Sequence, residues 1–443
     1  MRKLTTWLLT VLVICSATFI ESCKTDDDGV DPGTEPVVGE TITVKGTITT
    51  STTWKATNKY VLEGFVYVDN NAILTIEPGT IIKGDKLTKG SLIIKRGAKI
   101  MAEGTADKPI VFTSSVAKGS RNYGDWGGVI LLGKAPVNRA PATIEGENVS
   151  EFGGTDAADN SGVMKYVRIE FAGISFETDK EINGLTFGGV GSGTTIDYIQ
   201  TSYTGDDAFE WFGGTVNAKH LISYRTLDDD FDTDWGYSGN VQYGMALRDP
   251  AVADQCSCSD SNGFESDNDS NSSTATPQTS AKFSNISIFI APGTVNAKYR
   301  SAFRIRRNSA VSIYNSVVSG AYTKGGLELE GPETQLNFTS GKADYRGLIL
   351  SGMTKGLVSG DNTLLTDPAR KNNFAADLAT LKLDPAYNIL GTGVKVLPQT
   401  GSPLLTGGVT LPAGFEANTY VGAFGTTDWT KGWTNFDPQN TEY

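Results

Sequence analysis

The stretch GDDAFEWFGGTVNAKHLISYRTLDDDFDTDWGYSG, residues 205–239, decides the fold because it contains one short pattern twice. The segment DDAFE at residues 206–210 returns as DDDFD at residues 228–232, so that Phe209 and Phe231 stand 22 residues apart. A period of about 20 to 50 residues is typical of solenoids, propellers and other repeat arrays. The chain therefore repeats one structural unit.

Weaker copies of the pattern lie on both sides of this stretch. Upstream is NGLTF at residues 183–187, and downstream are NGFE at 262–265, SAFRI at 301–305 and GGLEL at 325–329. The central apolar residues of successive copies lie 24, 22, 33, 39 and 24 residues apart. The two long intervals predict coils that carry inserted loops.

Each copy is short and alternates apolar with polar residues, as a β-strand does when its side chains point to opposite faces. A coil of this length cannot bury an apolar face alone, so the coils must stack. The pattern predicts an all-β fold, a parallel β-helix solenoid with inserted loops and a C-terminal cap. Second strands are expected at residues 195–200, 218–224, 283–290 and 311–318.

The alternation also predicts which side chains point inward and which point outward. The central apolar residue of each copy is expected to stack inside the solenoid: Leu185, Phe209, Phe231, Phe264, Phe303 and Leu327. The residue after each is expected to form a row on the outside, exposed to water: Thr186, Glu210, Asp232, Glu265, Arg304 and Glu328. This outward row is the most informative feature of the sequence.

Composition limits the class of protein and the kinds of partner. A chain of 443 residues exceeds what one ordinary core supports, whereas a solenoid grows in one direction. A net charge of −12 argues against nucleic-acid binding, which needs a basic face. The single histidine, His220, excludes a histidine-rich zinc site, and we expect it to be an ordinary surface or turn residue.

The N-terminus resembles an export signal. Residues 1–22 contain a basic start and an apolar stretch, Trp7 to Ile20, that is too short to span a membrane and suits a signal peptide. Cys23 and the residues before it resemble a bacterial lipobox. Cleavage there and acylation of Cys23 would give a lipidated flexible tether over residues 23–40, followed by the parallel β-helix at 41–410.

The first coils carry a family resemblance. LTIEPGTIIKG at residues 74–84, GAKIMAEGT at 97–105 and KPIVFTS at 108–114 resemble the opening coils of right-handed parallel β-helix proteins of the pectin-lyase-like class. Together with the lipobox, the chain looks like a surface lipoprotein of the Bacteroidota type. The resemblance implies a right-handed solenoid, lipid-anchored in the outer membrane at the cell surface, and it brings no activity with it.

Two further segments carry separate expectations. Cys256 and Cys258, in the long insertion at residues 251–282, are expected to form a small local disulfide, with a two-thiolate metal site as the alternative. Residues 372–383 are expected to form a short amphipathic helix. The aromatic residues of 411–443 are expected to cap the open end of the solenoid, with a sugar-stacking platform as the alternative.

Acidic residues gather where the strongest copies stack. Neighbouring coils lie about 4.8 Å apart, and carboxylates at that spacing repel one another unless a cation offsets them. Ca²⁺ accepts six to eight oxygen ligands in loose geometry. The candidate calcium ligands are Asp206, Asp207, Glu210, Asp228, Asp230 and Asp232. The alternative is that these carboxylates accept backbone hydrogen bonds in turns.

Arg304 is the basic member of the outward row. In pectate lyases, which share the fold that the resemblance implies, outward acids bind Ca²⁺ and a nearby arginine acts as the base, so Arg304 is the candidate catalytic residue of a lyase. The simpler expectation is an ion pair with Glu265 or Glu328. Trp211, Trp235 and Tyr237 lie near the acids in sequence and are candidates for stacking on sugar rings, although Trp211 is phased inward.

These residues leave three functions open. The first is a non-catalytic, lipid-anchored surface module that binds a glycan, a nutrient or an outer-membrane partner on its acidic face, through Glu210, Asp232, Glu265 and Arg304. The second is a Ca²⁺-dependent polysaccharide lyase. The third is a glycosidase with Glu210 and Asp232 as its carboxylate pair, since adjacent coils suit the spacing of a retaining enzyme.

Overall fold

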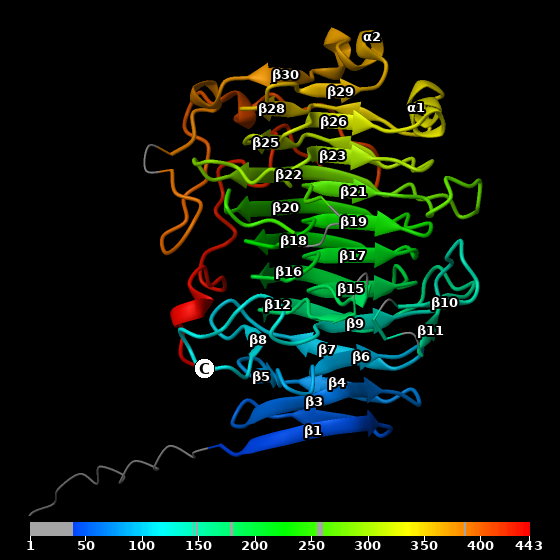
Figure 1. Ribbon diagram of the computed structural model, residues 1–443, viewed down its shortest axis with the longest axis vertical. Coiled ribbons are helices and arrows are strands. Elements are labelled where there is room, and N and C mark those ends of the chain that lie inside the picture. Colours follow the sequence, from blue (N-terminus) through cyan, green and yellow to red (C-terminus); the bar gives the residue numbers. More distant parts are fainter. Residues whose placement is uncertain (1–38, 145, 148, 178–179, 255–259, 385–386) are drawn as a thin grey trace, which may run out of the picture. The chain divides into compact units, whose positions relative to one another are not determined.

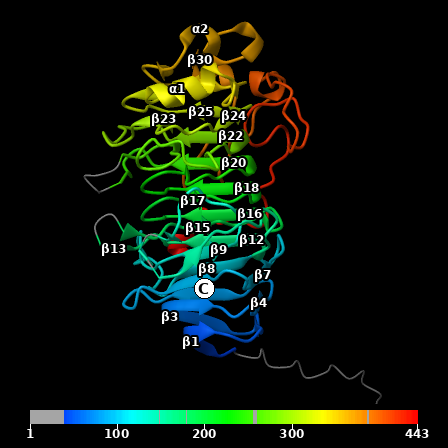
Figure 2. The same ribbon diagram turned by 90° about the vertical axis from the view of Figure 1, so that its right-hand side faces the viewer.

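The computed structural model describes residues 39–443 except 145, 148, 178–179, 255–259 and 385–386. The expected signal peptide, Cys23 and the Cys256–Cys258 pair lie outside the described residues. Parallel pairings join 26 strands into one continuous sheet, which winds into the right-handed β-helix that the repeats and the resemblance predict (Figures 1 and 2).

The pairings form three parallel ladders, and each coil passes through ladders B, C and A in turn. Ladder A contains the C-terminal halves of β1 (Thr41–Ile48) and β3 (Lys59–Val68), then β6 (Ser91–Ile94), β9 (Val129–Leu132), β15 (Leu185–Gly188), β17 (Phe209–Phe212), β19 (Phe231–Asp234), β21 (Phe264–Ser266), β23 (Ser301–Ile305), β26 (Gly325–Leu329) and β29 (Leu357–Ser359).

Ladders B and C share five long strands, β12 (Gly162–Glu170), β16 (Thr195–Ser202), β18 (Asn217–Tyr224), β20 (Asn240–Arg248) and β22 (Lys282–Ile290). Their N-terminal halves join ladder B with β2 (Thr52–Trp54), β4 (Ile73–Ile76), β7 (Lys99–Glu103), β24 (Ser312–Tyr314) and β27 (Tyr345–Arg346). Their C-terminal halves join ladder C with the N-terminal halves of β1 and β3, and with β5 (Ile81–Gly84), β8 (Ile110–Ser114), β25 (Val317–Ser319), β28 (Ile349–Ser351) and β30 (Asn373–Ala376).

The remaining elements are short. They are the antiparallel pairs β10 (Ala142–Thr143) with β11 (Glu151–Phe152) and β13 (Ser175–Glu177) with β14 (Lys180–Glu181), the helices α1 (Pro332–Thr339) and α2 (Asn362–Leu365), and the 3₁₀ turns η1 (Pro368–Arg370), η2 (Leu378–Leu381), η3 (Pro403–Leu405) and η4 (Pro438–Asn440). Among the described residues, no helix combines the length and the apolar character that crossing a membrane requires.

The predicted inward stack is confirmed. Leu185, Phe209, Phe231, Phe264, Phe303 and Leu327 pair in one register along ladder A, and all six side chains are buried in the central core. The rings of Phe209 and Phe231 stack with centroids 5.9 Å apart. Because parallel pairing without a register shift places equivalent positions above one another, one apolar residue per coil builds a continuous column.

A row of left-handed residues marks the corner between ladders B and C. The row contains Tyr166, Tyr198, His220, Tyr243, Asn285 and Asn315, all with φ between 45° and 64°. The left-handed conformation is uncommon for residues with a side chain, and here it recurs once per coil at the bend between the two ladders. The repeated bend brings the aromatic members of the row into contact: the rings of Tyr166 and Tyr198 lie 4.5 Å apart.

The C-terminal residues lie along the side of the solenoid, so the expected cap over its open end is wrong. The last strand of the ladders ends at Ala376, before the expected boundary at 410, and residues 387–443, here called the strap, run back down ladder C (Figure 1). Gln200 Nε2 donates to the Asn435 carbonyl at 2.7 Å, and Lys83 Nζ donates to the Tyr443 carbonyl at 3.1 Å.

The outer face of ladder C explains this path. It is apolar, and strap residues bury it: Ile222, Met245, Leu247, Phe289 and Val317 of the ladder share one cluster with Val396, Leu404, Val421, Phe424 and Trp433 of the strap. Leaving this face in water would cost roughly 25 cal/mol per Å² of apolar surface. The expected amphipathic helix at 372–383 is also wrong, because β30 and the 3₁₀ turn η2 occupy that segment.

Candidate functional site

The outward row lies on ladder A in the predicted register. Thr186, Glu210, Asp232, Glu265, Arg304 and Glu328 pair in that order on successive coils. The expectation that they would be exposed is wrong for most of them, since Thr186 is 0%, Glu328 3%, and Glu210 and Glu265 9% exposed. Neighbouring polar side chains cover the row; Asn183 donates to Glu210, and Arg306 to Glu265.

The turns that enter β17 and β19 add carboxylates to this row. Three groups hold carboxylate oxygens within 4.8 Å of one another: Asp206 with Asp207 and Asp228, Asp207 with Glu210 and Asp232, and Asp229 with Asp232 and Glu265. Asp207 and Asp232 each belong to two groups, so the three groups form one continuous acidic cluster. It includes five of the six candidate calcium ligands, and the Glu210–Asp232 pair stands together as adjacent coils predict.

The electrostatics of the cluster are unfavourable without a counter-charge. Burial raises the pKa of Asp207 and of Asp232 well above the usual range, and neighbouring carboxylates raise both further. Burial, followed by the charge of Asp267, raises the pKa of Asp234 to about 8. One oxygen of Asp232, Oδ1, is buried and has no hydrogen-bond partner among the described residues.

Asp230 does not join the cluster, which corrects its assignment as a calcium ligand. Its carboxylate points inward, where it accepts from Arg248 Nη1 at 3.0 Å and from the Ser223 hydroxyl at 2.6 Å. Arg248, which the sequence reading missed, is 0% exposed and also donates to the Asp228 carbonyl at 2.6 Å. Asp229 joins the cluster instead, beside Asp232 and Glu265.

Arg304 forms the expected ion pair with Glu265, with Nη1 2.8 Å from the carboxylate. Its Nε donates to Glu330 at 3.2 Å rather than to Glu328. Glu328 is held instead by Arg300 and by Lys324 Nζ at 2.8 Å; burial opposes these hydrogen bonds, yet its pKa falls to about 2. At this end of the row, guanidinium groups offset the carboxylates.

Two of the three expected sugar-stacking aromatics are unsuited to that role. Trp211 and Tyr237 are 0% exposed and stack on each other inside the core at 5.3 Å. Trp235 is 9% exposed and lies in an outer apolar cluster with Phe152 and Phe212, under the guanidinium of Arg139. A sugar cannot reach the rings of Trp211 and Tyr237, because both are fully buried in the core.

The cluster suits a hard divalent cation. Its ligands are all carboxylate oxygens, which Ca²⁺ prefers, and within the part of the chain that the structure describes the buried Oδ1 of Asp232 accepts no hydrogen bond. Asp207, Glu210 and Asp232 would hold the ion, with Asp206 and Asp228 beside them. Asp229 and Glu265 are less suited, since both oxygens of Asp229 accept from Asn262 and two arginines bind Glu265, whereas Asp207 accepts one backbone amide, through Oδ1.

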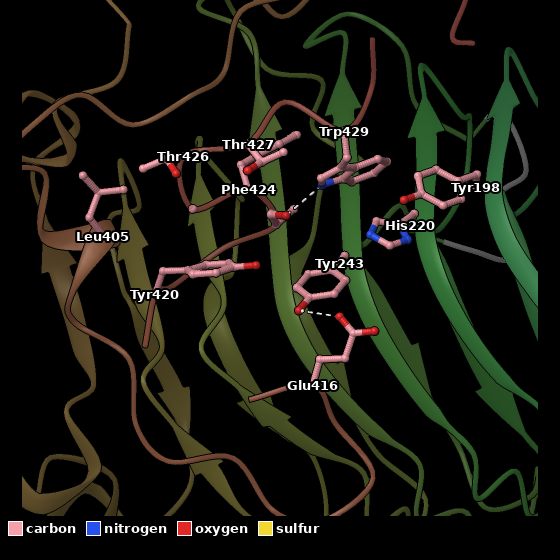
Figure 3. A pocket seen from close by; sticks show the side chains of 12 residues that line it. Tyr198, His220, Tyr243, Leu405, Glu416, Tyr420, Phe424, Thr426, Thr427 and Trp429 are labelled. Carbon is pink, nitrogen blue, oxygen red and sulfur yellow. Dashed lines mark hydrogen bonds between the residues drawn. The ribbon is translucent and has the colours of Figure 1, made fainter. Parts of the chain in front are cut away.

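A second feature lies at the corner between ladders B and C. A pocket of about 380 Å³, here called the aromatic pocket, opens between the corner row and the strap (Figure 3). Its lining residues are Tyr198, His220, Tyr243, Leu405, Glu416, Tyr420, Ala423, Phe424, Gly425, Thr426, Thr427 and Trp429. The strap contributes nine of these twelve, so the pocket exists only because the strap returns along the solenoid.

His220 lines this pocket at the bend between ladders B and C, and it makes more contacts than the ordinary surface or turn residue that was expected. It lies in β18, half-buried, with Nδ1 2.7 Å from Asp197 Oδ1 and its ring stacked on Tyr198 at 4.2 Å. The signal that could have found it is its spacing: Tyr198, His220 and Tyr243 follow one another at 22 and 23 residues, close to the 22 residues between Phe209 and Phe231.

Comparison with known proteins agrees with the fold. The family model described as "Pectate-lyase like beta helix domain" matches residues 46–434, which is most of the chain. A search of curated proteins found no match, and neither did a search of solved structures. Residues 46–434 extend from β1 into the strap, so the match covers both the acidic cluster and the aromatic pocket.

Proposed function

Because the chain belongs to the family of pectate-lyase-like β-helix domains, we propose that it is a non-catalytic, surface-anchored module that binds a glycan through a Ca²⁺ ion on ladder A. The carboxylate of Asp232 carries this proposal. It is shared by two acidic groups, one with Asp207 and Glu210 and one with Asp229 and Glu265, and its buried Oδ1 has no partner among the described residues.

The ion would bind first to Asp207, Glu210 and Asp232. A positive charge there removes the repulsion that raises the pKa values of Asp207 and Asp232. Ca²⁺ takes six to eight oxygens, more than three carboxylates supply. Because Asp206 and Asp232 are only half-buried, the open side of the cluster leaves room for hydroxyl or carboxylate oxygens of a glycan to complete the coordination.

The proposed location rests on the N-terminal sequence. A basic start, an apolar stretch and a lipobox-like segment before Cys23 support export and acylation at the outer membrane. Labelling cells with an alkyne fatty acid should mark the wild-type protein and leave Cys23→Ser unlabelled. Equal labelling of the two proteins would contradict the anchor.

The metal and the glycan are tested together on the purified mature protein. We expect Ca²⁺ to raise the melting temperature, and a glycan array to show ligands that EDTA removes. Asp232→Asn should lose both responses, while Glu103→Gln, an exposed acid on β7 away from the cluster, should keep both. A melting temperature that is the same in Ca²⁺ and in EDTA would contradict the metal site.

The lyase alternative needs Arg304 to accept a proton from the substrate. In the structure its guanidinium is held by two ion pairs, with Glu265 at 2.8 Å and with Glu330 at 3.2 Å. This geometry favours binding over elimination. Incubation with polyuronates, followed by absorbance at roughly 235 nm for an unsaturated product, decides between them. Unsaturated product that disappears in Arg304→Lys would establish the lyase. Cleavage that depends on the Glu210–Asp232 pair would establish a glycosidase.

A further inference from the structure

We propose that the aromatic pocket is a second binding site, which takes a neutral saccharide. It lies at the corner of ladders B and C, on different strands from the acidic cluster, and none of its twelve lining residues belongs to that cluster. The inference therefore goes beyond the proposed function and stands without Ca²⁺. Its volume of about 380 Å³ is within the usual range of small-ligand sites, about 300 to 1,000 Å³.

The walls of the pocket are held in place before a ligand arrives. On the solenoid side, His220 stacks between Tyr198 and Tyr243, with ring centroids 4.2 and 5.0 Å away. On the strap side, Trp429 stacks on Phe424 at 5.4 Å, and its Nε1 donates to the Ala423 carbonyl at 2.8 Å. Rigid aromatic walls lose little conformational entropy on binding, which favours affinity for a small ligand.

The strap is also fixed to the solenoid at the edge of the pocket. Gln242 of β20 forms a pair of hydrogen bonds with the backbone of Glu416, donating to its carbonyl at 2.9 Å and accepting from its amide at 2.9 Å. The Glu416 side chain accepts from Lys219 Nζ at 2.5 Å and from the Tyr243 hydroxyl at 3.2 Å, and Figure 3 shows the second of these bonds beside the pocket. Glu416 is thereby positioned by two different strands.

The polar groups of the pocket complement hydroxyl groups. Burial raises the pKa of Tyr198 to about 12 and raises those of Tyr243 and Tyr420 too, so all three keep a donating hydroxyl at neutral pH. The hydrogen bond from Lys219 lowers the pKa of Glu416, which stays an acceptor. His220 Nδ1 is bonded to Asp197, which leaves Nε2 as the ring nitrogen for a ligand.

The charges select against ionic ligands. No lysine or arginine is among the twelve lining residues, so an anionic sugar would meet the Glu416 carboxylate without a cation to pair with. An ammonium ligand would compete with Lys219 for Glu416, and it would meet ring edges, because several ring faces are already stacked on one another. A neutral ligand rich in hydroxyl groups fits both the charge and the polarity of the lining residues.

The test uses the mature protein in EDTA, so that the Ca²⁺-dependent site proposed on ladder A binds no sugar. Saturation-transfer NMR is run with glucose, galactose, mannose, N-acetylglucosamine and cellobiose, and any ligand found is titrated by calorimetry. We expect at least one of these sugars to bind. Glu416→Gln and Tyr420→Ala should weaken it at least tenfold, while Asp232→Asn should leave its affinity unchanged.

Conservative variants separate a binding role from a folding role. Tyr420→Phe keeps the ring and removes one hydroxyl, so we expect an unchanged melting temperature with weaker sugar binding. The proposal is overturned if none of the five sugars gives a saturation-transfer signal, if Asp232→Asn abolishes the binding, or if galacturonate or choline binds more tightly than every neutral sugar. Loss of Ca²⁺ binding with sugar binding intact would overturn only the proposed function.

Discussion

The acidic cluster and the aromatic pocket both come from stacking like residues on successive coils, with opposite energetic results. On ladder A the repeat places Glu210 beside Asp232, and their like charges repel. At the corner of ladders B and C the same period places His220 between Tyr198 and Tyr243, and their rings attract. A solenoid thus places like residues side by side, whether their interaction is repulsive or attractive.

The two regions also differ in what completes them. The acidic cluster is built from consecutive coils, and Oδ1 of Asp232 has no hydrogen-bond partner among the residues that the structure describes, which suits an added cation. The aromatic pocket is closed by the strap, whose Glu416 meets Tyr243 from 173 residues away.

The largest expected effect is that of Arg248→Met. It leaves the Asp230 carboxylate buried without its ion-pair partner, which typically costs about 3–5 kcal/mol of unfolding free energy. Urea unfolding measures the loss. We also expect the Ca²⁺ response to disappear, since Arg248 holds the turn of Asp228, while sugar binding persists. Lys45→Met, which removes an exposed ion pair, is the control and should change stability by less than about 0.5 kcal/mol.

Ca²⁺ at about 100 times its dissociation constant should stabilise the wild-type protein by about 2.7 kcal/mol. Asp232→Asn should remove that gain. In EDTA the same variant should be at least as stable as wild type, because it deletes one of several repelling buried carboxylates. Thermal melts of both proteins in Ca²⁺ and in EDTA check the two expectations; a variant that is less stable than wild type in EDTA would show that Asp232 is structural.

The free energy of unfolding of the metal-free protein should depend on pH, because each unit of pKa shift corresponds to a free energy on the order of 1 kcal/mol. The pKa of Asp234 is about 8 when folded against an ordinary 3.8, so the folded state binds the extra proton, and stability falls as the pH rises from about 4 to 8. Glu328 contributes with the opposite sign, because its pKa is lowered to about 2 in the folded state. Its contribution to stability is fully present above about pH 4.5 and is lost as the pH falls towards 2.

Melting curves in EDTA from pH 3 to 9 measure this dependence. We expect Asp234→Asn to flatten the alkaline fall and Glu328→Gln to flatten the acidic one. Added Ca²⁺ should lessen the part of the alkaline fall that comes from Asp207 and Asp232, since the ion binds their ionised carboxylates. A metal-free stability that rises steadily from pH 5 to 8 would contradict the account of the cluster.

The smallest expected effect is in the aromatic pocket. Tyr243→Phe keeps the ring stack and removes the hydrogen bond to Glu416. The free energy of unfolding should fall by about 0.5–1.5 kcal/mol. The Ca²⁺ response should not change, because Tyr243 lies on β20 at the corner and not on ladder A. Calorimetric unfolding with and without Ca²⁺ checks both points, and a changed Ca²⁺ response would mean that the two regions are coupled.

The solenoid was predictable from the sequence because its information is local and repeated. Alternation within each copy separates Phe231 from Asp232, and the period aligns both with the copies above and below, so the inward column and the outward row were correct in register. Burial of that row was not predictable, since the side chains that cover Glu265 come from Arg304 and Arg306, about 40 residues later in the chain.

The sequence by itself determined the coils, the register of ladder A and the neighbours Glu210 and Asp232, because a parallel ladder repeats one residue pattern at one spacing. Only the tertiary structure decided that Asp229 points outward while Asp230 pairs with Arg248, since a run of three aspartates in a turn carries no alternation of its own. It also decided the path of the strap, and with it the aromatic pocket, because burying the apolar face of ladder C depends on contacts between segments far apart in the chain.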